Sequence, residues 1–260
     1  TQGDPATELK NVHNKKVVSY GNRLYCRYDE GRAEHSYGAT TTYSKYFTDY
    51  RRFLERPYYF AREALEQKSE YESVYLIDLD LSQFFDRIDR RLLAKSIRNL
   101  AAGMSETGKE SLKTLNNILD AFINWEWSEP AKQKFLSTCA SDTRQEAPSG
   151  LPQGMVASGF LANIYMASFD DHMNGLIGDN IDADFSIRLV DYCRYVDDMR
   201  LVVVGPSQKS LREISDSDPH DLINEAILRA LQPKLDALNL MANEKKTKIE
   251  VFRGKSAGIS

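Results

Sequence analysis

Two adjacent acids stand in the stretch RYVDDMRLVVV, residues 194–204, between runs of strand-forming apolar residues. Each of Asp197 and Asp198 raises the cost of ionising the other, because like charges repel. Such a pair fits a solvated hairpin turn, and it equally fits a site where a divalent cation holds both carboxylates ionised. A third carboxylate elsewhere in the chain would favour the cation site.

Asp80 is the candidate for that third carboxylate. In VYLIDLDL, residues 74–81, side chains alternate across a predicted buried strand, so Asp78 and Asp80 project from the same face. An acid in so apolar a strand is costly unless it is paired or binds a metal. Asp80 could instead cap the following helix. We interpret Asp78 as a supporting acid and Asp86 as a helix-start residue favoured by the helix dipole.

The elements that must position these acids follow from the spacing of apolar residues and from Pro and Gly. Helices are predicted at 43–67, 87–100, 109–127, 155–173 and 218–240, and strands at 73–81, 187–205 (a hairpin) and 246–254. Pro57 predicts a break or kink in the first helix, and Asp218 or Asp221 is expected to cap the last. This order predicts an α+β fold with helices packed on one face of a mostly antiparallel sheet.

The composition is that of an ordinary soluble globular protein, with 260 residues, 42% hydrophobic and 28% charged. No apolar run approaches the roughly 18–20 residues of a membrane span, and the N-terminus has no signal-peptide pattern. Three scattered cysteines, Cys26, Cys139 and Cys193, indicate reduced thiols. We therefore expect a cytoplasmic protein without a membrane partner.

Net charge does not identify the partner. The value of −4 argues mildly against nucleic acid, whose phosphates are bound mainly by Lys and Arg. Basic side chains nevertheless gather in residues 85–100 and 243–255, and their distribution matters more than the sum. Either stretch could also be a solvated face.

Four segments resemble, in order and spacing, the palm motifs of reverse transcriptases. They are DLSQFFDRI (80–88), SGLPQGMVASGFLANIYM (149–166), YVDD (195–198) and NLMANEKKTKI (239–249). They look more like the bacterial retron, group II intron and abortive-infection lineages than the retroviral one. The resemblance implies a right-hand polymerase with N-terminal fingers at 1–74, palm at 75–99, a helical fingers or insert region at 100–148 and palm at 149–260. No thumb is evident, which fits a piece of a longer protein or a compact bacterial form.

The same resemblance implies the metal ligands. Asp80, Asp197 and Asp198 would hold two Mg²⁺ ions, with Mn²⁺ as an alternative, and the backbone carbonyl of Leu81 would also bind the nucleotide's metal. Polymerisation is an in-line displacement at an α-phosphate by a primer 3′-hydroxyl, which two metals about 3.5–4 Å apart promote. Hard Mg²⁺ prefers oxygen ligands, so carboxylates suit it.

Phe85 lies five positions after Asp80, where the resemblance places an aromatic ring against the sugar of the nucleotide. A large apolar side chain there would exclude a 2′-hydroxyl by steric rejection, so DNA synthesis is favoured. The alternative is that Phe85 is only a core aromatic. An RNA polymerase with the same palm is disfavoured by this residue.

The remaining nucleotide-binding residues are also implied by the resemblance. Gln153 and Gly154 of the LPQG loop would lie beside the incoming nucleotide, where the Gln amide can hydrogen-bond without adding charge. Lys246 would neutralise or protonate the pyrophosphate leaving group. Its neighbours Lys245 and Lys248 are alternatives for that role.

The N-terminal region is less readable. YGNRL, residues 20–24, resembles defence-associated bacterial reverse transcriptases, without a role for each residue. Fingers of the family supply Lys or Arg to the triphosphate, and the candidates are Arg23, Arg27, Arg32, Arg51 and Arg52. Trp125 and Trp127 are interpreted as core or interface residues rather than base-stacking platforms.

The resemblance implies a reverse transcriptase whose partners are an RNA template, a DNA primer or product and dNTPs. A dedicated non-coding RNA and an oligomer are left open, and antiphage defence is a hypothesis resting on family analogy alone. One alternative is a template-independent or self-primed DNA polymerase. Another is a non-catalytic RNA-binding scaffold, against which the three intact acids speak.

Overall fold

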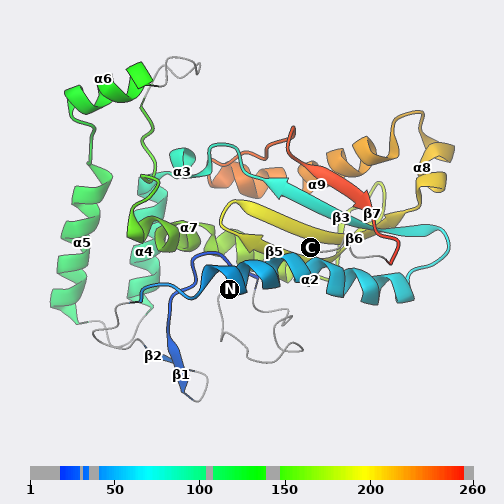
Figure 1. Ribbon diagram of the computed structural model, residues 1–260, viewed down its shortest axis with the longest axis horizontal. Helices are drawn as coiled ribbons and strands as arrows, with labels where there is room; N and C mark the ends of the chain where they lie inside the picture. The colour runs from blue at the N-terminus through cyan, green and yellow to red at the C-terminus, as the bar shows by residue number, and fades with distance from the viewer. Residues whose placement is uncertain (1–17, 30–31, 35–40, 104–107, 139–146, 255–260) are drawn as a thin grey trace.

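The computed structural model describes residues 18–29, 32–34, 41–103, 108–138 and 147–254 (Figure 1). Its helices are α2 (Tyr46–Gln67), α3 (Phe84–Arg87), α4 (Arg90–Ala102), α5 (Lys109–Ile123), α6 (Glu129–Thr138), α7 (Val156–Gly175), α8 (Gln208–Ile214) and α9 (Pro219–Ala237). Its strands are β1 (Arg27–Asp29), β2 (Arg32–Glu34), β3 (Glu72–Asp80), β4 (Asn180–Asp182), β5 (Ile187–Tyr195), β6 (Asp198–Pro206) and β7 (Lys248–Val251). None of the helices in these ranges is long and apolar enough to span a membrane.

A five-stranded sheet in the order β4-β5-β6-β3-β7 forms the centre of the fold, and every pair in it is antiparallel. The predicted α+β class and antiparallel sheet are confirmed. Strand β3 pairs with β6 along its whole length, from Glu72 opposite Pro206 to Asp80 opposite Asp198. The sheet therefore ends, on one side, with acids from two neighbouring strands.

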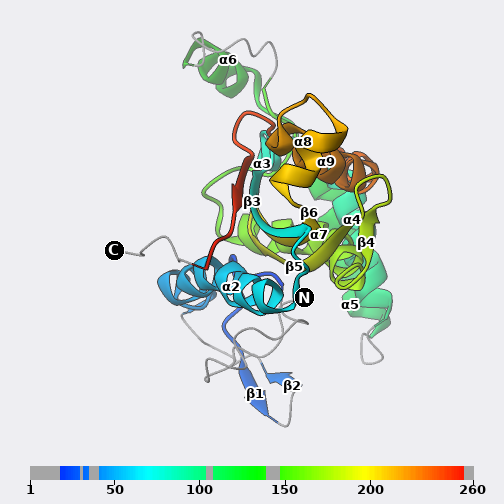
Figure 2. The same cartoon turned by 90° about the vertical axis from the view of Figure 1, so that its right-hand side faces the viewer.

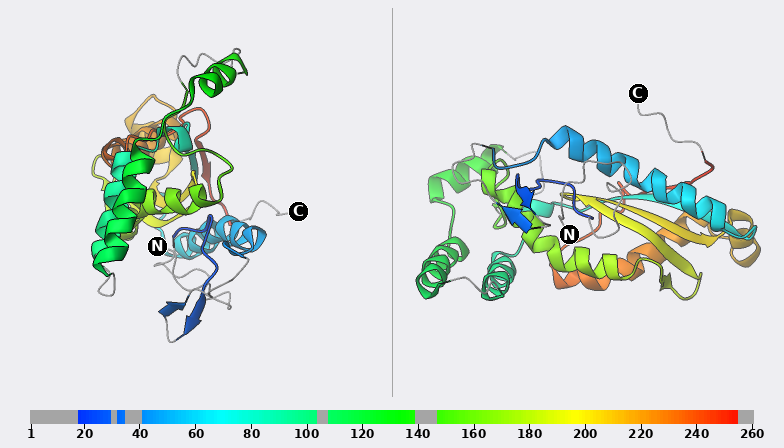
Figure 3. Two further views of the ribbon diagram at one scale, coloured as in Figure 1. Left: turned by 90° about the vertical axis from the view of Figure 1, so that its left-hand side faces the viewer. Right: turned by 90° about the horizontal axis from the view of Figure 1, so that it is seen from below.

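Helices cover both faces of this sheet. On one face, α7 and α9 pack against alternate apolar residues of β3 and β6 such as Ile77, Leu79 and Leu201. On the other face, α2 packs through Phe60 and its neighbours on residues of the opposite parity, such as Val74. Figures 2 and 3 show the sheet between α2 and the pair of helices α7 and α9. The prediction placed helices on one face, and α2 adds a layer on the other because strand residues there are apolar too.

Pro57 was predicted to break or kink the helix; α2 continues through it, so the helix does not break there. Proline lacks the N–H that would bond the carbonyl of Phe53 four residues earlier. Sγ of Cys193, on β5, lies 3.9 Å from that carbonyl, and Nη1 of Arg200 lies 3.4 Å from the carbonyl of Leu54. Side chains of the sheet thus bond to the part of α2 that proline weakens.

Several elements differ from the prediction. The helix expected over 109–127 ends at Ile123, and a separate helix, α6, follows; α5 and α6 extend from one end of the sheet (Figure 1). Asp218 caps α9, accepting a hydrogen bond from the N–H of His220 at 2.8 Å. Cys26 and Cys193 are free thiols, as predicted, and Cys139 lies outside the described residues.

Candidate active site

The three predicted acids lie at one end of three neighbouring strands. Asp80 ends β3 and pairs in register with Asp198, the first residue of β6. Tyr195, the last residue of β5, also pairs with Asp198, so Val196 and Asp197 form a two-residue turn. Antiparallel register alone therefore brings two carboxylates opposite each other and places the third on the adjoining turn.

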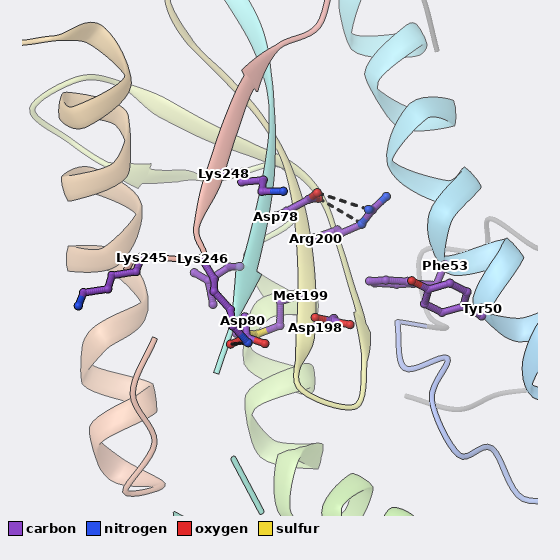
Figure 4. Close-up of a pocket in the computed structure, with 11 residues that line it drawn as sticks. Tyr50, Phe53, Asp78, Asp80, Asp198, Met199, Arg200, Lys245, Lys246 and Lys248 are labelled. Carbon is purple, nitrogen blue, oxygen red and sulfur yellow. Dashed lines mark hydrogen bonds and ion pairs between the residues drawn. The ribbon is translucent and has the colours of Figure 1, made fainter. Parts of the chain in front are cut away.

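A cleft of about 410 Å³ opens over this end of the sheet (Figure 4). Asp80 and Asp198 lie in it, and α2 contributes Tyr50 and Phe53 to one wall. The remaining lining residues are Asp78, Leu79, Met199, Arg200, Lys245, Lys246 and Lys248. The cleft combines acids with several cationic side chains, which is a suitable environment for polyanions that arrive with divalent cations.

Two of the acids, Asp197 and Asp198, lie where their negative charge is unfavourable. Burial raises the pKa of Asp197, and the Asp80 carboxylate raises it further. Burial likewise raises the pKa of Asp198, to which the charges of Asp197 and Asp80 add. Loss of hydration and like-charge repulsion both disfavour the ionised forms. A bound cation would reverse that balance.

Lys246 provides a cation in direct contact with one of these acids. Its Nζ lies 3.2 Å from Oδ2 of Asp80, and the amide of Asn243 donates to the same oxygen at 3.2 Å. Figure 4 shows Lys246 directed to Asp80, whereas Lys245 points away toward α9. Of the alternative lysines, Lys246 is therefore the one that reaches the acids. Asn243 was not singled out in the sequence.

Leu81 is buried directly after Asp80 and pairs with Ala242 in an antiparallel bridge. The bridge uses groups on either side of Leu81: the N–H of Asn243 donates to the Asp80 carbonyl at 2.7 Å, and the N–H of Ser82 donates to the carbonyl of Met241 at 2.8 Å. In this pattern the carbonyl of Leu81 faces away from residues 241–243 and toward the hairpin side.

Phe85 lies in the short helix α3, beside the LPQG loop. Its backbone carbonyl accepts a hydrogen bond from the N–H of Leu151 at 2.8 Å. A Cβ on Gly150 would lie 2.0 Å from that same carbonyl oxygen, so only glycine permits this approach. Phe84 is buried beneath, with its ring 5.3 Å from that of Phe85, which is partly exposed. The first two motifs are thus joined at this point.

Gln153 and Gly154 are exposed on the loop, and Gly154 has a left-handed φ of 86°. Ser158 Oγ donates to the carbonyl of Pro152 at 2.6 Å, which ties the loop to the start of α7. Gln153 lines a different cavity, of about 330 Å³, whose wall includes Trp127. The structure therefore places Gln153 near the first motif but outside the cleft that holds Asp80.

Comparison with known proteins identifies the family. Residues 39–257 match the family described as reverse transcriptase (RNA-dependent DNA polymerase). The chain belongs to this family. It is 29% identical over 132 residues to the retron Ec83 reverse transcriptase of Escherichia coli, a match that covers 51% of this chain and 33% of that protein. The chain thus spans about a third of the length of the curated relative that it matches.

Among solved structures, the chain is similar to chains of two telomerase structures. Apo telomerase from Candida tropicalis truncated from its C-terminal domain is 15% identical, with a TM-score of 0.42 over 81% of this chain and 36% of that one. Telomerase from Candida albicans with a fragment of telomeric RNA is 15% identical, with a TM-score of 0.40 over 76% of this chain and 29% of that one.

The donor set of this site fits a hard divalent cation. Carboxylate oxygens are the ligands that Mg²⁺ prefers, and the ammonium of Lys246 already occupies a cation's position beside Asp80. In the described ranges, however, no group of three or more His, Cys, Asp or Glu side chains is arranged to hold a metal as it stands. The residues suit the ion by the chemistry of their oxygen donors.

Of the triphosphate candidates in the N-terminal region, the three whose side chains are described, Arg23, Arg51 and Arg52, do not line the cleft. Arg23 is only 4% exposed, which argues against a role in contacting a triphosphate. Arg51 pairs with Glu55 along α2 at 2.8 Å, and Arg52 lies 3.7 Å from Asp49. The side chains of Arg27 and Arg32 lie outside the described part of the structure.

Arg200 is a site residue that the sequence analysis missed. Its Nε lies 3.1 Å from Oδ1 of Asp78, and its guanidinium stacks 5.2 Å from the ring centroid of Phe53 (Figure 4). Burial raises the pKa of Asp78, and the charge of Arg200 opposes that rise. Alternation along β6 could have revealed this residue, since Arg200 and Asp198 must face the same side.

Proposed function

We propose that this chain carries the catalytic centre of an RNA-directed DNA polymerase that works by two-metal-ion nucleotidyl transfer. The observation that supports this most is the register of Asp80 opposite Asp198, with Asp197 on the turn that joins β6 to β5. In this proposal the palm consists of residues 75–99 and 149–260, and the fingers consist of residues 1–74 with a helical region at 100–148.

Asp80, Asp197 and Asp198 would bind the ions through their carboxylates, with the carbonyl of Leu81 as a further ligand. Two Mg²⁺ ions bound there would lower the pKa of the primer 3′-hydroxyl and neutralise charge on the leaving pyrophosphate. Lys246, released from Asp80, would then reach the pyrophosphate oxygen and donate a proton to it. Mn²⁺, which shares the preference for oxygen ligands, would serve as a substitute.

Phe85, Gln153 and Gly154 would form the nucleotide side of the site. The hydrogen bond from the N–H of Leu151 to the carbonyl of Phe85 keeps the LPQG loop against α3, so Phe85 and Gln153 lie on segments that are joined through the backbone. The ring would exclude a 2′-hydroxyl by steric overlap, and the amide would bond the sugar or a phosphate.

The template and the primer enter the proposal only as classes of molecule. An RNA template, a DNA primer and dNTPs follow from the family, and the similarity to a retron reverse transcriptase supports testing a dedicated RNA as well. No contact among the described residues bears on antiphage defence, so that role is not included.

Incorporation of labelled dNTPs and NTPs with Mg²⁺ tests the proposal. The full-length protein is assayed with and without a primed RNA template, and Asp197→Asn serves as a nearly isosteric control that cannot ionise. We expect template-dependent dNTP incorporation that the variant lacks. Incorporation that ignores added template would support a template-independent or self-primed DNA polymerase instead. No incorporation from a folded protein, with or without RNA co-purified from cells that express it, would support a scaffold.

A further inference from the structure

The turn that carries Asp197 has a backbone conformation that needs support. Val196 has φ of 60°, in the left-handed region that β-branched residues rarely adopt. Strained backbone of this kind persists only where its surroundings impose it. Two groups contact this turn: the side chain of Arg194, which lies on β5 just before it, and the backbone of Gly21, which is distant in sequence.

The first group is the guanidinium of Arg194, the residue two positions before Val196. Its Nη1 donates to the carbonyl of Val196 at 2.7 Å. Its Nε and Nη2 donate to the carboxylate of Asp170 on α7, at 2.9 and 2.7 Å, and both side chains have no exposed surface. Nη2 also lies 3.1 Å from Ser19 Oγ and 3.2 Å from Asn163 Oδ1. These contacts fix the orientation of the planar guanidinium and direct its Nη1 at the turn.

The second group is the backbone of Gly21. The segment around it runs beside β5, where the N–H of Tyr20 donates to the carbonyl of Arg194 and the N–H of Arg194 donates to the carbonyl of Val18, both at 2.8 Å. A Cβ on Gly21 would lie 2.6 Å from the nitrogen of Val196 and 2.7 Å from its Cγ2. The glycine backbone therefore rests directly on the turn.

Asn163, on α7, connects the two groups. Its Nδ2 donates to the carbonyl of Gly21 at 2.7 Å, and its Oδ1 accepts from Arg194. The turn of the hairpin is thus held between a buried guanidinium and a glycine, and both are attached to the same helix.

We propose that Arg194 and Gly21 are positioning residues that hold the Val196–Asp197 turn in its strained conformation and thereby aim the Asp197 carboxylate at the metal ions. The inference rests on the proposed function, and it assigns to residues 18–22 a part in the catalytic centre. Residues that orient metal ligands, without binding the metal themselves, commonly change metal affinity or activity by about 10- to 100-fold when replaced.

Gly21→Ala tests the glycine contact, and Gly175→Ala is its matched control, because a Cβ on Gly175 meets nothing within 4 Å. Three quantities are measured on the full chain: Mn²⁺ affinity by electron paramagnetic resonance without nucleic acid, kcat and KM for dNTP incorporation, and the thermal midpoint. We expect Gly21→Ala to weaken Mn²⁺ binding and lower kcat by about 10- to 100-fold, with the KM for primer–template unchanged. Values equal to those of Gly175→Ala would overturn the inference.

A double-mutant cycle tests Arg194 even if Gly21→Ala fails to fold. Arg194→Lys keeps a positive charge beside Asp170 and loses the fork that reaches the Val196 carbonyl. Val196→Gly adopts a left-handed φ without strain. If Arg194 acts by holding this turn, the loss of Mn²⁺ affinity from Arg194→Lys should be several-fold smaller in the Val196→Gly background. Equal losses in both backgrounds would mean that Arg194 only stabilises the fold.

The two readouts separate this inference from the proposed function. A wild-type protein that binds Mn²⁺ but incorporates no dNTP would disprove polymerisation, and the Mn²⁺ affinities of the variants would still decide the positioning role. If the wild-type protein incorporates dNTPs and the variants incorporate them equally fast, only the positioning role is disproved.

Discussion

Arg56 and Asp191 form an ion pair that joins α2 to β5 from the interior of the protein. Nη2 of Arg56 lies 2.7 Å from Oδ1 of Asp191, and the two side chains are 0% and 1% exposed. Although burial disfavours the charged guanidinium, the Asp191 carboxylate raises the pKa of Arg56 above its ordinary value. The pair lies on the α2 face of the sheet, opposite the Arg194–Asp170 pair on the α7 face. Strand β5 is therefore held from both sides.

Removal of one partner of this pair should destabilise the fold strongly. Asp191→Ala leaves a buried guanidinium without its carboxylate, which typically costs about 3–5 kcal/mol. Chemical denaturation monitored by circular dichroism measures the loss. Arg51→Ala is the control, since Arg51 is 75% exposed in its pair with Glu55 and should cost less than about 1 kcal/mol. A loss for Asp191→Ala no larger than for Arg51→Ala would show that the buried pair contributes little.

Local pattern was sufficient to predict the strands that carry the acids. Alternation in VYLIDLDL placed Asp78 and Asp80 on one face, and the register confirms it, because Asp78 faces Arg200 and Asp80 faces Asp198. The cap of α9 was narrowed to two residues, of which Asp218 is the one that bonds the helix. These features depend on neighbours in sequence, so periodicity and capping preferences can predict them.

Contacts between distant segments could not be predicted in the same way. Asp191 has nothing in its own stretch to indicate Arg56, which lies 135 residues away. Gly21 likewise could not be distinguished from an ordinary loop glycine, since glycine is required there because the backbone of Val196 approaches so closely. The helix through Pro57 depends on side chains of β5 and β6 that bond the carbonyls near it. In each case the feature depends on tertiary packing, so local propensity could not predict it.

Replacing the acids should stabilise the metal-free protein while abolishing synthesis. The pKa of Asp198 is raised in the folded state, so its ionised form opposes folding at neutral pH. This destabilisation is lost as the pH falls from the folded-state pKa to the lower pKa of the unfolded state. Asp198→Asn should therefore raise the thermal midpoint in EDTA at pH 7, and because Asp198 is exposed to solvent the rise should be small. The difference from wild type should shrink toward pH 4. A lower midpoint for the variant at pH 7 would contradict this account of the acids.

Replacing Phe85 should relax the choice of sugar. Phe85→Ala removes the ring that would overlap a 2′-hydroxyl, so the ratio of kcat/KM for NTPs to that for dNTPs should rise about 10- to 100-fold. Steady-state incorporation of each nucleotide on one primed RNA template measures it. Because Phe85 also packs against Phe84 and the core, the thermal midpoint should fall, and the ratio is measured at a temperature where the variant is folded. An unchanged ratio in a folded variant would mean that the ring only packs against Phe84.

The two adjacent lysines should differ sharply in their effect on catalysis. Lys246 Nζ lies 3.2 Å from Asp80, whereas Lys245 points away from the acids (Figure 4). If Lys246 donates a proton to pyrophosphate, Lys246→Met should lower kcat by about 10²-fold or more, as expected for loss of a general acid. Lys245→Met should stay within about twofold, because Lys245 lines the cleft but its side chain is directed away from the acids and so adds only screened charge. Rapid-quench measurement of a single incorporation, over a range of pH, isolates the chemical step. The basic limb of the wild-type pH profile should disappear in Lys246→Met. Equal losses of kcat in the two variants would mean that both lysines act only through their positive charge.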